Sequence, residues 1–293
     1  MRTEIKFMNE KILKRTALSC LIIFAVMIAV HAFEAIVLRM DETILGENFI
    51  NKVFGIALVF IVLKCLKWKA GDIGFARRGF IKGAALGLLL ASVSFTFSYA
   101  AEIMLLKSQG QDVTLGIFTS GFSLTGNAEI HTGIGYILMC IFFNIINVVM
   151  EEGTFRGLFY HIVGSDHAPR TALLFQALLF GVWHIVTPLH NLIDGDMNVA
   201  SFIGMSIGYI ILAGLMGIKW SLLYNMTGNL YAGMADHFFN NCIATNLLHV
   251  TTSEGTDDMM IVRVMIAQLI SFAAVVIFWK RKHTTVKKFE YAN

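Results

Sequence analysis

The sequence has little charge and little proline. Only 15% of its 293 residues are charged, whereas soluble domains carry roughly 25%. Two prolines, Pro169 and Pro188, leave most helices free to run unbroken. With a mean hydropathy of +0.69, these scarcities exclude an ordinary soluble domain and predict an integral membrane protein.

The chain also lacks a cysteine framework. Its four cysteines lie in or beside apolar runs, and their spacing matches neither a disulfide scaffold nor a metal motif. We expect them to act as small buried apolar residues. No internal repeat, low-complexity stretch or soluble domain interrupts the apolar runs. The short alternating pattern of a membrane β-barrel is missing as well.

Eight apolar segments predict an all-α polytopic bundle of about eight transmembrane helices. We expect a single integral-membrane domain over residues 1–293, with a motif-bearing core at about 133–250. Segment 107–132 is predicted to be a loop with one short interfacial helix at 113–119. The apolar segments cover about 16–38, 49–66, 79–106, 133–163, 171–187, 200–226, 229–248 and 259–279.

The first segment and the basic residues predict how the chain lies in the membrane. The first apolar run continues to Leu38, which is longer than a signal-peptide core and favours an uncleaved span. Most of the 23 Lys and Arg residues fall on one side if the N-terminus is cytoplasmic. The positive-inside rule therefore predicts a multi-pass cell-membrane protein with both termini in the cytoplasm.

Two adjacent carboxylates, Glu151 and Glu152, lie within an apolar run. Charge at membrane depth is costly and marks functional sites. Arg156 lies at i+4 from Glu152, which predicts an ion pair between these two residues. Such a pair leaves Glu151 without a charged partner and makes it the candidate for chemistry.

Spacing predicts that other polar residues reach the same depth. Glu151 and His184 are almost equally far from the turn at Gly164–Arg170, so antiparallel helices bring them side by side, about 20 Å from that turn. His237 and Asn241 share one face of a later helix. We expect structural roles for other polar residues near these positions. Asn144 and Asn147 should pack between helices, and His31, Glu34 and Glu102 should lie at the membrane interface. Asp236 and Asn240 should support the structure.

The order of these residues resembles a known family. Glu151-Glu152-x-x-x-Arg156 resembles the EExxxR motif of the CAAX prenyl protease and bacteriocin-processing (CPBP, or Abi) family of intramembrane proteases. Phe180-x-x-x-His184 is similar to its FxxxH motif, and His237-x-x-x-Asn241 to its HxxxN motif. The resemblance covers about residues 145–245 and matches every motif position.

The resemblance implies an intramembrane endopeptidase similar to type II CAAX prenyl endopeptidases. By this likeness Glu151 activates water, His184 positions the water, and His237 and Asn241 stabilise the oxyanion. Glu152, Arg156 and Phe180 support these four residues. The implied partners are a peptide or lipidated protein substrate and membrane lipids, with no nucleic acid.

Alternatives remain open at the level of the sequence. We favour no cofactor and a metal-free reaction, because the chain has no HExxH motif and Asn is a poor zinc ligand. If zinc were bound, Glu151, His184 and His237 would hold it. A transporter or proton relay is a second possibility, although no inverted repeat supports it. A non-catalytic immunity or scaffold protein is a third.

Overall fold

The computed structural model describes residues 15–43, 47–120 and 130–290, and eight helical segments dominate these ranges. They coincide with the eight apolar runs of the sequence. In chain order they are α2 (Thr16–Phe33) with the π-helix η1 (Glu34–Leu38), α3 (Ile50–Leu66), α4 (Phe80–Ser108), α5 (Ile134–Glu151) with the π-helix η4 (Glu152–Phe159) and α6 (Tyr160–Gly164), α7 (Pro169–Trp183) with α8 (Val186–Ile193), α9 (Val199–Thr227), α10 (Tyr231–Phe238) with the π-helix η5 (Phe239–Thr245), and α11 (Met260–Glu290).

Six of these segments, counted over the described residues, are long and apolar enough to cross a membrane. Two segments are shorter: α3 has 17 residues and α10 has 8 before its π-helical continuation. The all-α polytopic bundle predicted from hydropathy is confirmed. The six spans are Thr16–Glu42, Phe80–Ser108, Ile134–Gly164, Pro169–Ile193, Val199–Thr227 and Met260–Lys282.

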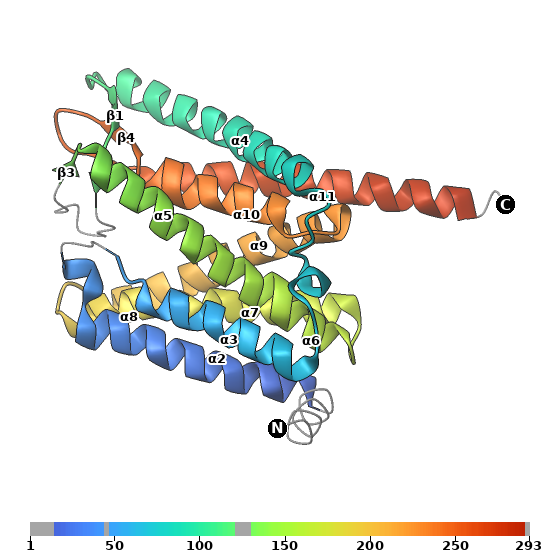
Figure 1. Cartoon of the computed structure of the whole chain (residues 1–293). Coiled ribbons are helices and arrows are strands. Elements are labelled where there is room, and N and C mark those ends of the chain that lie inside the picture. The colour runs from blue at the N-terminus through green and yellow to red at the C-terminus, as the bar shows by residue number, and fades with distance from the viewer. Residues whose placement is uncertain (1–14, 44–46, 121–129, 291–293) are drawn as a thin grey trace.

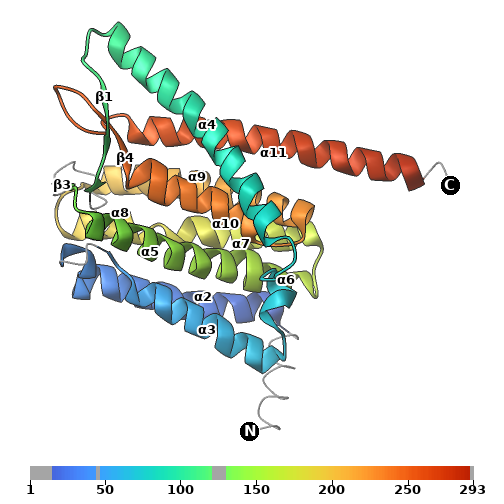
Figure 2. The same cartoon turned by 45° about the horizontal axis from the view of Figure 1, so that its top comes forward.

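The helices run roughly side by side, and successive segments alternate in direction (Figures 1 and 2). Helix α2 begins, and α11 ends, at the same end of the bundle. The turn between α6 and α7 also lies at this end, whereas the short strands lie at the opposite end. This arrangement is what an even number of passes requires.

Two small antiparallel sheets cover the far end of the bundle. Strand β1 (Thr114–Ile117) pairs with β4 (Leu248–Thr251), and β2 (Thr119–Ser120) pairs with β3 (Ile130–His131). The predicted interfacial helix at 113–119 is therefore wrong. A partner strand more than a hundred residues away supplies the backbone hydrogen bonds of β1, and no local pattern announces such a partner.

Two carboxylates expected near the interface, Glu34 and Glu102, are buried against neighbouring helices. Glu34 accepts hydrogen bonds from the backbone N–H groups of Ile50 (2.7 Å) and Asn51 (2.6 Å), and so caps the first turn of α3. Glu102 of α4 pairs with Arg263 of α11 at 2.8 Å. Burial of these carboxylates is tolerated because each one is paired or multiply hydrogen-bonded.

Small residues bring the helices that carry the motifs close together. A Cβ added at Gly87 of α4 would lie 2.1 Å from the carbonyl oxygen of Ala232 in α10. A Cβ at Gly181 of α7 would lie 2.6 Å from the carbonyl oxygen of Ile210 in α9. Such close backbone approach is how helices associate in membranes. It fixes α10 against α4 and α7 against α9.

Candidate active site

Glu151 lies at the C-terminal end of α5 and is held by two other helices. The indole Nε1 of Trp183, at the end of α7, donates a hydrogen bond of 3.1 Å to Oε1 of Glu151. Nε2 of His237, on α10, lies 3.3 Å from Oε2 of Glu151. Glu151 is 4% exposed and His237 is 2% exposed. The predicted meeting of these helices at one depth is therefore observed.

Both motif-bearing helices change to π-helix within the motif. Helix α5 passes into η4 between Glu151 and Glu152, and α10 passes into η5 between His237 and Asn241. A π-helical turn widens the helix and re-aims its side chains, and such turns are frequent at functional sites. The change separates the two carboxylates, so that each one contacts a different nitrogen of the His237 ring.

The second carboxylate, Glu152, anchors the site through Arg156. Nε of Arg156 donates to Oε2 of Glu152 at 2.8 Å, and Nη2 donates to Oε1, so the ion pair predicted from their spacing is confirmed and is bidentate. The guanidinium lies over the rings of Phe180 (4.0 Å) and Trp220 (4.7 Å). These contacts explain Phe180: it covers a buried cation.

The hydrogen bonds of His237 define its tautomer. Nδ1 lies 2.9 Å from Oε1 of Glu152, and this paired carboxylate accepts the Nδ1 proton. In the neutral ring Nε2 then carries a lone pair, which accepts the Nδ2 hydrogen of Asn241 at 3.1 Å. Oε2 of Glu151 has no hydrogen-bond partner. An unpartnered carboxylate oxygen therefore faces the site beside the imidazole.

His184 enters the site less directly than its motif predicts. Helix α7 ends at Trp183 and α8 begins at Val186, so the span Pro169–Ile193 is interrupted at His184. Nδ1 of His184 donates to the carbonyl oxygen of Phe180 at 2.7 Å. Phe180 also makes an edge contact with His237, with ring centroids 6.1 Å apart. His184 thus borders the same cluster, and in the described residues no hydrogen bond joins it to Glu151.

Several residues of the site were not predicted from the sequence. Trp220 stacks on His237 with ring centroids 4.0 Å apart, and its Nε1 donates to Asp236 at 2.7 Å. Asp236 forms a buried ion pair with Lys219, which agrees with its expected structural role. The positive-inside rule counts Lys219 with the other basic residues, but Lys219 is 1% exposed and carries no orientation signal. The position of Lys219 inside a long apolar run was the feature of the sequence that could have indicated a buried ion pair.

Asn144 on α5 has a more local role. Asn144 donates to the carbonyl oxygen of Cys140 within the same helix, at 2.9 Å, so it does not join two helices. Asn144 and Asn147 are both buried. The cysteines are all free, as their positions predicted.

The donor atoms do not favour the alternative zinc set. Across the described ranges, one group of three possible ligands lies close enough to share an ion, and it consists of Glu42, His190 and Asp194. This group contains none of the three residues of the alternative zinc set, and Arg39 already pairs with both of its carboxylates. Both nitrogens of His237 and Nδ1 of His184 have hydrogen-bond partners. The absence of a cofactor stays a prediction.

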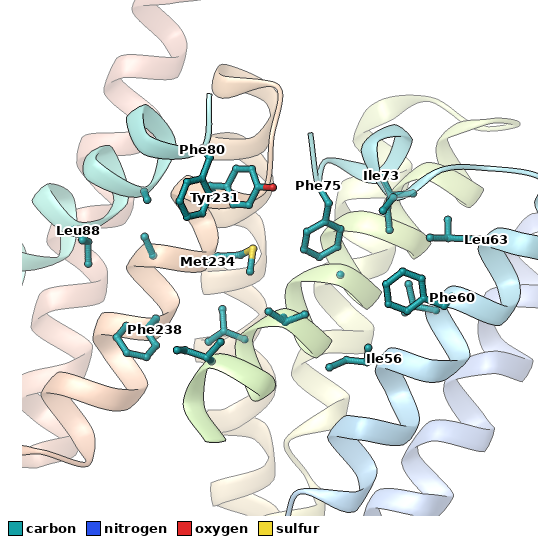
Figure 3. Close-up of a pocket in the computed structure, with 18 residues that line it drawn as sticks. Ile56, Phe60, Leu63, Ile73, Phe75, Phe80, Leu88, Tyr231, Met234 and Phe238 are labelled. Carbon is teal, nitrogen blue, oxygen red and sulfur yellow. The ribbon is translucent and has the colours of Figure 1, made fainter. Parts of the chain in front are cut away.

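An apolar groove of about 690 Å³ lies on the other side of the motif helices. One wall consists of α3 and the segment before α4, with Phe60 and Phe75; the other consists of α4 and α10, with Phe80, Leu88 and Phe238 (Figure 3). Val149 and Gly153 of the α5–η4 segment also line it, on either side of the two carboxylates in the sequence. The groove is therefore separated from Glu151 by about one helix diameter, roughly 10 Å.

Comparison with protein families places the motifs in one domain. Residues 133–243 match the family described as Type II CAAX prenyl endopeptidase Rce1-like. Curated proteins and solved structures give no match. The matched stretch runs from just before α5 into η5 and includes all three motifs. The chain thus contains an Rce1-like domain of a protease family, which confirms the CPBP family expected from its motifs.

Proposed function

We propose that the protein is an intramembrane endopeptidase that hydrolyses a peptide bond of a membrane-associated or lipidated protein. The observation that carries this proposal is Glu151: a buried carboxylate with one oxygen held by Trp183 and the other unpartnered beside His237. Hydrolysis requires a base for water and hydrogen-bond donors for the oxyanion. This site offers both, within the Rce1-like domain.

In the proposed mechanism Oε2 of Glu151 takes a proton from water as the water oxygen attacks the scissile carbonyl carbon. Nδ2 of Asn241 donates a hydrogen bond to the oxyanion of the tetrahedral intermediate. Nε2 of His237, 3.3 Å from Oε2, can receive the proton from Glu151 and then donate to the same oxyanion. When the C–N bond breaks, the proton passes to the leaving amine. His184 positions the water.

The apolar groove supports a lipidated substrate. Its volume lies within the roughly 300–1,000 Å³ of ligand sites, and its lining is apolar throughout. Phe60 and Phe80 stand on opposite walls and are 59% and 53% exposed, so the groove opens toward lipid. A chain bound there would hold a peptide about one helix diameter from Glu151.

We place the groove mouth and both termini on the cytoplasmic side of a cell membrane. The segment between α3 and α4 borders the groove and carries exposed Lys67, Lys69, Arg77 and Arg78. This segment lies at the end of the bundle where α2 begins and α11 ends (Figure 1). Basic loops favour the cytoplasmic side.

Cleavage in proteoliposomes tests the function and the groove together. A quenched fluorescent peptide, with and without a fifteen-carbon chain on a cysteine, is offered to the wild type, Ala84→Phe and Ala85→Phe. Ala84 lines the groove, whereas its neighbour Ala85 is exposed and does not. We expect Ala84→Phe to raise KM at least fivefold for the lipidated peptide only, and Ala85→Phe to behave as wild type. No cleavage of either peptide, together with proton flux, would favour the transporter alternative.

A further inference from the structure

A continuous chain of hydrogen bonds, buried or partly buried, runs from Lys219 on α9 to the catalytic cluster. Nζ of Lys219 donates to Oε1 of Gln268 on α11 at 2.6 Å. Nε2 of Gln268 donates to Oδ1 of Asn240 at 2.9 Å, and Nδ2 of Asn240 donates to Oδ1 of Asn241 at 2.7 Å. Nδ2 of Asn241 then reaches Nε2 of His237. Every link points in the same direction.

The two ends of this chain fix that direction. A lysine ammonium has donors and no acceptor, so Gln268 must turn its oxygen toward Lys219 and its NH₂ toward Asn240. The same argument then orients Asn240 and, through it, Asn241. At the other end Glu152 is acceptor-only as the ion-pair partner of Arg156, so His237 donates from Nδ1 and accepts at Nε2. Both ends require the same polarity, and aligned links polarise one another.

We propose that Lys219, Gln268 and Asn240 form a positioning relay that holds the Asn241 amide with its NH₂ group, and not its oxygen, toward the reacting atoms. An isolated amide can turn over and present either group. The relay removes this freedom. It also directs an N–H of Asn241 to Nε2 of His237, which then acts as a hydrogen-bond acceptor and leaves Oε2 of Glu151 open to the proton of water.

The relay depends on one residue outside the matched range. Gln268 lies on α11, beyond the matched residues 133–243, and is 5% exposed. If these hydrogen bonds were only structural, each amide could satisfy its partners in either orientation. In the proposed relay the orientation of each amide matters. A substitution that keeps the side-chain size and the number of hydrogen bonds but reverses the donor–acceptor direction therefore tests the proposal.

Gln268→Glu is such a substitution. The carboxylate can still accept from Lys219, but it cannot donate to Asn240. Asn240 then turns its NH₂ group toward the carboxylate, Asn241 turns in response, and the oxygen of Asn241 faces His237. Asn240→Asp has the same consequence from the next link, which provides a second variant if the first fails to fold. Ser271→Ala is the matched control: Ser271 contacts Lys219 at 3.0 Å from the same helix but is not a link of the relay.

Solid-state ¹⁵N NMR of histidine-labelled protein in liposomes reads the orientation without requiring activity. The His237 signals are assigned by their loss in His237→Gln. We expect an unprotonated Nε2 in the wild type and Ser271→Ala, and a protonated Nε2 in Gln268→Glu or Asn240→Asp. Unchanged His237 signals in both reversing variants, with protein that is folded, would overturn the relay.

Kinetics test the catalytic consequence, which rests on the proposed function. With the same lipidated peptide, Gln268→Glu and Asn240→Asp should lower kcat by about 10²–10³, as expected when an oxyanion donor is lost, with KM within threefold of wild type. Ser271→Ala should keep both parameters. A wild-type kcat in a reversing variant whose NMR signals have changed would refute the positioning role. If the wild type cleaves nothing, the proposed function fails, while the NMR result still decides whether the relay exists.

Discussion

Arg156→Lys keeps the buried positive charge of the site but removes its shape. In the structure the guanidinium donates through Nε and Nη2 to both oxygens of Glu152 and lies over the rings of Phe180 and Trp220. A lysine ammonium is a point charge without this planar fork. The substitution therefore asks whether the motif needs a cation or this particular geometry.

The expected cost follows from the contacts that are lost. One charge-assisted hydrogen bond contributes about 1.5–3 kcal/mol, and weaker stacking on two rings adds about 0.5–1 kcal/mol. We therefore expect the free energy of unfolding to fall by about 2–4 kcal/mol. Glu152 also accepts a hydrogen bond from Nδ1 of His237. If Glu152 is held less firmly, the imidazole of His237 is positioned less precisely, and turnover should fall at least tenfold.

Denaturant unfolding in detergent micelles and peptide cleavage measure the two effects separately. Arg170→Lys is the matched control, because Arg170 is exposed near the start of α7 and makes no described ion pair. The control should change the unfolding free energy by less than 0.5 kcal/mol, as is usual for surface substitutions. A loss below about 1 kcal/mol in Arg156→Lys would refute the argument from geometry.

Three other predictions address the remaining parts of the account. Asn241→Ala should lower kcat by about 10²–10³ while leaving the binding of an uncleaved peptide nearly unchanged, as single-turnover kinetics beside a binding titration will show. Strong chelation should not inactivate the purified enzyme; a stoichiometric zinc lost together with activity, by elemental analysis, would contradict this. Although burial opposes its ionisation, the hydrogen bond from His249 and the charge of Arg263 hold the pKa of Asp257 below its usual range. Ionised Asp257 therefore stabilises the folded protein fully at pH values above the usual range of an aspartate pKa, and this stabilisation is lost as the pH falls through the folded-state pKa. Asp257→Asn should accordingly lower the melting temperature at pH 7 and change it little near pH 2.

Hydropathy was sufficient to predict the helices, because burying apolar runs in lipid is a local property of each segment. The spacing of the motifs also predicted that Glu151 lies at the same depth as the motif residues of α7 and α10. It did not predict that α7 ends at Trp183, although Pro188 cannot donate a backbone hydrogen bond to the carbonyl group of His184, four residues earlier. The β1–β4 pairing could not be predicted, because strands of four residues gain their stability from a distant partner.

Buried charges were the main source of error. Counting by the positive-inside rule treats each basic residue as solvated, but Lys219 and Arg263 are paired inside the bundle with Asp236 and with Glu102. Pairing across helices depends on which faces meet, and the sequence does not specify that. Gln268 was missed for the same reason: a polar residue on the last helix gains its role only where α11 packs against η5.

The most direct test of the proposed protease is Glu151→Gln, assayed by mass spectrometry of peptide cleavage in ¹⁸O-labelled water. Glutamine can still accept from Trp183 and can donate to Nε2 of His237, so the melting temperature should stay within about 3 °C of wild type. The wild type should place one ¹⁸O in the new carboxyl terminus, and the variant should be slower by about 10²–10⁴ because it lacks the base. Turnover within a few-fold of wild type in the folded variant would contradict the assignment of Glu151.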